Sequence, residues 1–365
     1  MSSGAVDPAR AAGGDRPARA GRGTSTTTRG ARRGGLRGAG RTALQIVAVA
    51  ALYYASGKLG LFQQLVRGQV TPLWPPTGIS LAGLLVFGPR IWPGIALGAF
   101  LINLSLGPSF PAVLAITTGN TLAPLCSCAL LRRVGFRPSL NRFRDALALV
   151  FLGGFAGMLI SATVGSGTLR LAHELPAGGF WPTWWVWWTG DAMGVLVVTP
   201  VLLVLRSAHL PKHAPPSRWH EAMLLAAATI GVGLLENAPP PLAFLAFPLL
   251  TCAAFRFQLA GTAPCALAVS TSAILAATRG TGPFAGHTLV TNMIALQAFN
   301  GAAAMTALLL AAVVTERNEA QQKIEETCRR LADMAARIAP DTGGPPVLPR
   351  DRSDEEESGG PTRRP

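Results

Sequence analysis

Charged residues are scarce in this sequence, and acidic residues especially so. Only 14% of the 365 residues are charged and 49% are hydrophobic, whereas a soluble protein carries about 25% charged residues. This shortage excludes an ordinary soluble domain and indicates a polytopic membrane protein with polar tails. The 32 basic residues outnumber the 18 acidic ones, but they lie in the N-terminal stretch and in short loops. Membrane topology explains that distribution, and we expect no nucleic acid partner.

Cysteines are also few, and their positions exclude a disulfide framework. Of the five cysteines, Cys126 and Cys128 lie two residues apart on a predicted helix, so their side chains point to different sides. The other three lie in separate segments. We expect reduced thiols, no metal site and no cofactor.

Long apolar runs make up most of the remaining chain. Ten segments are apolar enough to enter a bilayer: 42–64, 72–88, 91–107, 111–131, 145–169, 184–205, 221–238, 242–260, 261–278 and 291–314. The second and third are short, and only Pro89 and Arg90 separate their cores. They form either two spans or a broken, re-entrant pair. The predicted fold is an all-α, polytopic integral membrane helix bundle with eight to ten transmembrane helices.

The basic residues in the loops predict the orientation of the chain. With the N-terminus inside, each outer loop holds at most one basic residue, from the set Arg67, Arg170 and Arg279. The inner turns hold the rest: Arg90, Arg132, Arg133, Arg137, Arg142, Arg144, Arg206, Lys212, Arg218 and Arg256. Positive residues favour the cytoplasmic side. We therefore predict a multi-pass plasma (inner) membrane protein with both termini in the cytoplasm.

The two ends differ in composition from the apolar region at 42–314. Residues 1–41 and 340–365 have almost nothing to bury, so we expect both to be disordered. Residues 315–339 continue the last span as a cytoplasmic helix. A three- and four-residue spacing joins its apolar positions: Val314, Ile324, Cys328, Leu331, Ala335 and Ile338. This pattern predicts a homodimeric coiled coil through 315–338, although Arg317 and Gln321 weaken the seam, and a single fraying helix remains an alternative.

One apolar stretch, Trp181–Pro200, carries an acid. In a helix, Trp184, Trp188 and Asp191 fall along one face. An ionisable group at membrane depth costs at least ~2.5 kcal/mol, so it faces the bundle interior and marks a functional site. Gly190 and Gly194 provide a small-residue step that lets another helix approach closely.

Two partners for Asp191 are considered. Lys58 lies roughly 9 Å and Asp191 roughly 10 Å from the same predicted surface, at 1.5 Å per residue. An ion pair between them would relieve both burial costs. Alternatively, Lys58 reaches out to the interface, and Asp191 is protonated or bound to water. In a further interpretation, Asp191 meets a ligand cation held over Trp184 and Trp188.

Other small and polar residues inside the segments have structural or ligand-binding interpretations. Gly153 and Gly157 are typical of close helix packing. Asn120 lies near mid-membrane, where it either hydrogen-bonds across helices or contacts a ligand.

Several motifs, taken in order, resemble one family, the bacterial membrane-associated sensor domain of the first type (MASE). The matching residues are Trp74-Pro-Pro-Thr-Gly-Ile79, Phe87-Gly-Pro-Arg-Ile-Trp-Pro-Gly94, Gly119-Asn-Thr121, Arg144-Asp145, Ser161-Ala-Thr163 and Trp184-Trp185 through Gly190-Asp191 to Gly194 and Pro200. The resemblance implies a sensory domain that passes a signal through its last helix to a cytoplasmic output. Trp74, which opens the first motif, joins Asp191, Lys58, Trp184, Trp188 and Asn120 as a sensing candidate.

The expected output is supplied by another protein. Families of this kind commonly end in a histidine kinase or a cyclic-di-GMP-turnover domain. After residue 314, the sequence has no phospho-accepting histidine, ATP-binding glycine box, or Gly-Gly-Asp-Glu-Phe or Glu-Ala-Leu signature. We expect a two-component-like sensor that is not itself an enzyme and that acts on such a kinase or cyclic-di-GMP enzyme in trans. A small-solute transporter and a structural or vestigial membrane anchor remain alternatives.

Overall fold

The computed structural model describes residues 27–61, 71–106, 109–207, 216–236, 242–284 and 289–338, and every regular element in these ranges is a helix. The α-helices are α1 (Thr27–Leu61), α2 (Pro75–Phe87), α3 (Trp92–Leu104), α4 (Phe110–Arg133), α5 (Phe143–Ala148), α6 (Gly157–Leu171), α7 (Phe180–Met193), α8 (Thr199–Ser207), α9 (Pro216–Glu236), α10 (Ala246–Arg279) and α11 (Leu289–Ile338). The all-α membrane fold is confirmed, and each of the ten predicted apolar segments is helical over most of its length.

Proline lies at the start of three helices. Helices α2, α3 and α4 each have proline at one of their first two positions. Proline has no amide hydrogen to leave unpaired there, and its fixed φ already suits a helix. The Gly88-Pro89 turn ends α2, because Gly88 adopts a φ of 89°, in the region that favours glycine.

Two long helices each contain a π-helical turn, which the apolar pattern of the sequence does not predict. Leu149–Ala156 joins α5 to α6, and Gly194–Val198 joins α7 to α8. Pro200 follows the second turn; its ring lacks an amide hydrogen and would crowd the carbonyl four residues earlier in a regular α-helix. The wider turn relieves this conflict, and π-turns are frequent at functional sites.

Six of the described helical stretches are long and apolar enough to cross a membrane: Ala39–Leu61, Phe110–Arg133, Phe143–Leu171, Phe180–Arg206, Ala243–Arg279 and Thr291–Arg337. The other expected spans are α2, α3, α9 and one half of α10. Helices α2 and α3 have 13 residues each, about 20 Å at 1.5 Å per residue, so each falls short of a ~30 Å hydrocarbon core. Their length agrees with the broken-pair alternative.

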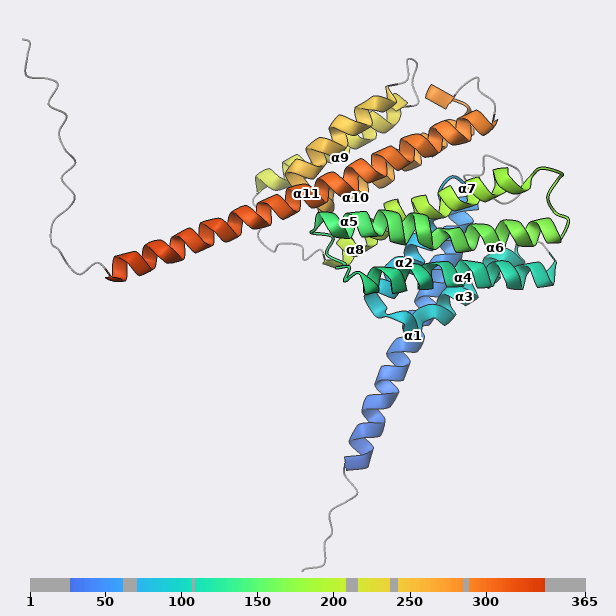
Figure 1. Ribbon diagram of the computed structural model, residues 1–365, viewed down its shortest axis with the longest axis horizontal. Helices are drawn as coiled ribbons and strands as arrows, with labels where there is room; N and C mark the ends of the chain where they lie inside the picture. Colours follow the sequence, from blue (N-terminus) through green and yellow to red (C-terminus); the bar gives the residue numbers. More distant parts are fainter. Residues whose placement is uncertain are drawn as a thin grey trace, which may run out of the picture. The chain divides into compact units, whose positions relative to one another are not determined.

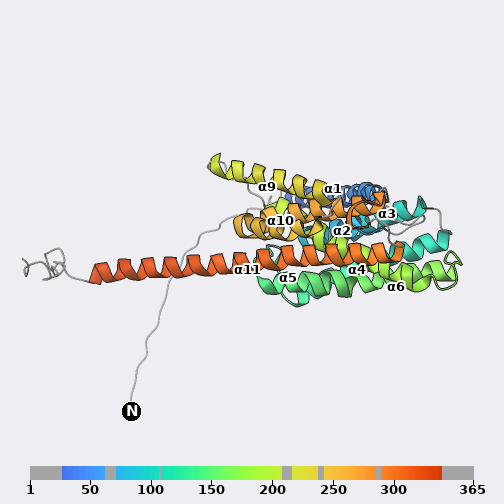
Figure 2. The ribbon, with the colours of Figure 1, turned by 90° about the horizontal axis from the view of Figure 1, so that it is seen from above.

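Helix α10 reverses at Gln258, where the backbone leaves helical geometry with φ 52° and ψ −142°. Ala246 packs in one cluster with Val269, and Leu250 in another with Cys265. In a straight helix the first pair would lie about 35 Å apart. The two halves are therefore an antiparallel pair, as the separate segments 242–260 and 261–278 predicted, and α9 lies beside them (Figure 1, Figure 2).

Helix α1 begins at Thr27, inside the N-terminal tail expected at residues 1–41. The division of the chain into two tails, a membrane domain and a cytoplasmic helix stays a prediction. The expectations for residues 1–26 and 340–365 lie outside the described residues.

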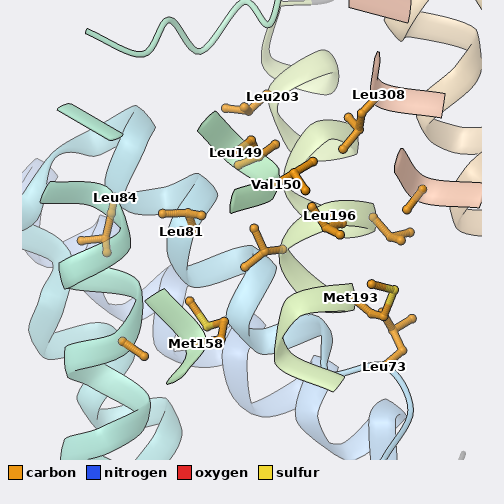
Figure 3. Close-up of a cluster of buried hydrophobic side chains, with 14 of the residues drawn as sticks. Leu73, Leu81, Leu84, Leu149, Val150, Met158, Met193, Leu196, Leu203 and Leu308 are labelled. Atoms are coloured by element: carbon orange, nitrogen blue, oxygen red, sulfur yellow. The ribbon is translucent and has the colours of Figure 1, made fainter. Parts of the chain in front are cut away.

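A hydrophobic core joins helices that are distant in sequence. Figure 3 shows Leu81 of α2, Val150 of the first π-turn, Leu196 of the second π-turn and Leu308 of α11 in one cluster. Met193 and Leu73 meet at its edge. The two π-turns thus face the centre of the core, directly beside the acid-bearing part of α7.

The contacts between residues divide the chain into two compact units, the first of which ends at Val314. Helix α11 continues across this point as one 50-residue helix (Figure 1, Figure 2).

Candidate functional site

Asp191 of α7 is buried inside the bundle, with 2% of its surface exposed. Thr77 of α2 donates a hydrogen bond to its Oδ1 (2.6 Å), and Ser161 of α6 donates one to its Oδ2 (2.5 Å). The indole of Trp187, one turn earlier on α7, lies close to the carboxylate. One carboxylate therefore connects three helices through charge-assisted hydrogen bonds, which are stronger than neutral ones.

Backbone contact between α7 and residues 71–78 brings these groups together. The Trp74 amide donates to the Gly190 carbonyl (3.0 Å). A Cβ atom at Gly190 would overlap the Thr71 carbonyl oxygen, and one at Gly194 would overlap the Trp74 carbonyl oxygen. Only glycine at both positions permits this approach, which sets Thr77 over Asp191.

A second polar group lies around Tyr53 of α1, whose side chain is buried. Its hydroxyl lies close to the side chains of Trp74 and Asn120. Trp74 thus links the two groups, because its backbone contacts α7 at Gly190 and its indole contacts Tyr53. The candidates Asp191, Trp74 and Asn120 come together in one polar region.

The predicted ion pair between Lys58 and Asp191 is wrong. Lys58 Nζ donates to Ser105 Oγ at 2.8 Å and lies 5.5 Å from the centre of the Tyr54 ring. The ion pair was predicted from the similar depth of the two charged residues in the membrane. Hydroxyl groups from α2 and α6 instead donate hydrogen bonds to both oxygens of Asp191. Lys58 is instead partly exposed and bound by Ser105.

We expect Lys58→Met and Asp191→Asn to act independently. Residues without shared partners show additive losses within about 0.5 kcal/mol. The measurement is the thermal stability in detergent of both single variants and the double variant. A double variant more stable than the sum of the single losses would restore the ion pair.

Trp184 and Trp188 are engaged with each other and with hydrogen-bond acceptors on neighbouring helices. Their rings stack at 5.8 Å and 17°. Trp184 Nε1 donates to Thr163 Oγ1 (3.0 Å), and Trp188 Nε1 donates to the Phe155 carbonyl (2.8 Å). Each ring covers one face of the other, so a ligand cation over this pair would have to bind the outer faces. That ligand stays a prediction.

Gly153 and Gly157 lie where α4 meets the helix formed by α5 and α6; α4 and α6 are side by side in both views (Figure 1, Figure 2). Ser127 Oγ donates to the Gly153 carbonyl at 2.9 Å. A Cβ atom at Gly157 would overlap the same hydroxyl. This contact holds α6, and therefore Ser161, in place.

Sequence reasoning missed Tyr53, Trp187 and the roles of Thr77 and Ser161. The contact of Trp187 could have been predicted, because Trp187 precedes Asp191 by four residues and lies on the same face of the helix. Thr77 and Ser161 belong to motifs that resemble the sensor family. Their local sequence does not show that they bind Asp191, which lies 114 residues from Thr77 and 30 residues from Ser161.

The site can hold a negative charge or a proton in a place sealed from water. In the described part of the chain, no group of three His, Cys, Asp or Glu side chains could hold a metal ion. A change in the charge of Asp191 would change its bonds to α2 and α6 together, because both helices bind the same carboxylate.

Comparison with known proteins places this geometry in a family. The family model MASE1 matches residues 44–318, most of the chain. The chain therefore belongs to the MASE1 family, whose members are membrane sensory input domains. It is 27% identical over 193 residues to a protein of Escherichia coli (strain K12) described as probable diguanylate cyclase DgcE; the match covers 48% of this chain and 16% of that protein. No solved structure matches the chain.

Proposed function

We propose that this MASE1 chain senses a signal at the Asp191 site and relays it through α11 to a separate cytoplasmic protein. The observation that carries the proposal is one buried carboxylate bound by α2 and α6 and carried by α7. A signal that changes this carboxylate changes the packing of all three helices, and a two-state shift in packing can pass information across a protein.

The partner we propose is a histidine kinase or a cyclic-di-GMP enzyme acting in trans. The name of the Escherichia coli relative, a probable diguanylate cyclase, supports the second class. Residues 315–338 of α11 supply the surface for output. The exposed side chains of Ile324 (63%) and Leu331 (56%) are apolar on a helix that is otherwise highly charged, which favours an association with another helix.

A second copy of α11 is the partner that the heptad spacing favours. If the cytoplasmic part of α11 dimerises, Cys328 should form a cross-chain disulfide under mild oxidation in native membranes, because it occupies a seam position between Ile324 and Leu331. In a Cys328→Ser background, Glu325→Cys lies outside the seam and should cross-link much less. Equal cross-linking at both positions would indicate random collision and contradict the dimer.

Both ends of the membrane domain are proposed to face the cytoplasm, since basic residues concentrate at that side. A reporter enzyme that is active only outside the membrane should be inactive when fused after residue 340. The same reporter inserted after residue 177, in the 170–183 loop, should be active. Activity after residue 340 would overturn the orientation.

A further inference from the structure

Helix α11 contacts the sensing site through one polar side chain. Gln297 Nε2 donates a hydrogen bond to the Pro72 carbonyl at 3.0 Å. Pro72 lies between Thr71 and Trp74, whose backbones press against Gly190 and Gly194 of α7. The segment bonded by Gln297 is therefore the segment that holds Thr77 over Asp191.

A second carboxamide on α11 is buried without a partner. Asn300 is 1% exposed, and within the described chain neither its Oδ1 nor its Nδ2 has a hydrogen-bond partner. Residues three apart on a helix are neighbours on one face, so Asn300 follows Gln297 by about 4.5 Å along the axis. An unsatisfied buried amide is rare and calls for an explanation.

The rest of the inner half of α11 is suited to sliding. Its buried side chains are mostly alanine: Ala303, Ala304, Ala307, Ala311 and Ala312. Small side chains form shallow ridges, so they resist a displacement along the helix axis less than larger ones would. Leu308, which is buried among these alanines, would have to leave its place in the core. Packed helices are known to move past one another by one turn between two discrete positions.

We propose that Gln297 and Asn300 are two alternative partners of the Pro72 carbonyl, and that α11 moves by about one turn between them. In the position seen here, Gln297 binds Pro72. In the other position, Asn300 replaces it, and the cytoplasmic part of the helix is displaced by about 4.5 Å. This inference rests on the proposed function, because it assigns the contact through which Asp191 acts on α11.

The test follows the inner end of α11 by cysteine labelling. In a chain with its five cysteines changed to serine, single cysteines are placed at each position from 313 to 317. A membrane-impermeant maleimide is applied to inside-out vesicles. Asp191→Asn, which removes the buried charge, should move the accessibility boundary by about three residues. In a Gln297→Leu background, Asp191→Asn should cause no further movement, whereas the control Asn292→Leu on the same helix should preserve the full shift.

The outcomes separate the two proposals. An equal shift with and without Gln297 would overturn the coupling contact and leave the proposed function standing. An absence of any shift in the otherwise wild-type chain would overturn both. Should Gln297→Leu fail to fold, Asn300→Leu replaces it: it should keep the resting boundary and block the shift, and an unblocked shift would overturn the two-position contact.

Discussion

Replacing Gly194 with alanine is expected to be among the most damaging single substitutions in the membrane domain. The new Cβ would overlap the carbonyl oxygen of Trp74, and its next neighbours are also backbone atoms. Backbone cannot rotate away as a flexible side chain can, so α7 and residues 71–78 must separate. Overpacking commonly costs about 1–3 kcal/mol and occasionally more, and we expect at least about 3 kcal/mol here.

Gly167→Ala in α6 is the matched control. A Cβ atom at Gly167 would meet nothing within 4 Å, and alanine favours a helix over glycine by up to about 1 kcal/mol. Thermal unfolding in detergent, followed by tryptophan fluorescence, should show a large loss for Gly194→Ala and none for Gly167→Ala. Similar curves for both variants would contradict the close backbone contact.

Much of the fold could be predicted from composition because a bilayer leaves few choices. An apolar chain in lipid must satisfy its backbone hydrogen bonds within each segment, so long apolar runs become helices. Hydropathy predicted a reversal between segments 242–260 and 261–278 but did not place it at Gln258. The π-turn before Pro200 was not predicted, because segment hydropathy does not show where a proline widens a helix.

The sequence predicted the central residue of the site, Asp191, but not the residues that contact it. Asp191 stood out because burying an acid in a membrane is costly, and the spacing of Gly190 and Gly194 indicated a close approach. The partners of Asp191 were missed because neutral hydroxyl groups can satisfy a carboxylate as well as a lysine can. Thr77 and Ser161 resemble many structural hydroxyls in helices, so only the fold shows which of them meet the acid.

Thr77→Val and Asp191→Leu are expected to be strongly coupled. Asp191→Leu leaves the Thr77 hydroxyl without its acceptor, whereas Ser161 can still donate to the Met158 carbonyl at 3.0 Å. A buried polar group without a partner costs about 1–3 kcal/mol. Thr77→Val in turn removes one donor from the buried carboxylate.

The double variant Thr77→Val/Asp191→Leu should lose less stability than the two single variants added together, by about 0.5–3 kcal/mol. Replacing both partners with apolar groups leaves no orphaned group behind. Unfolding in detergent of all four chains gives this difference. Strict additivity would show that the Thr77–Asp191 bond contributes nothing to the folded domain.

The most direct test of a sensing role for Asp191 is a distance measured within one chain. In a chain with its five cysteines changed to serine, spin labels are placed at Val134→Cys, at the end of α4, and at Val313→Cys on α11. Pulsed electron paramagnetic resonance measures their separation, with unlabelled chain in excess to suppress distances between copies. Both positions are exposed. We predict that Asp191→Asn changes the most populated distance and that Gly167→Ala does not. Distance distributions that superimpose for the wild type and Asp191→Asn would contradict the account.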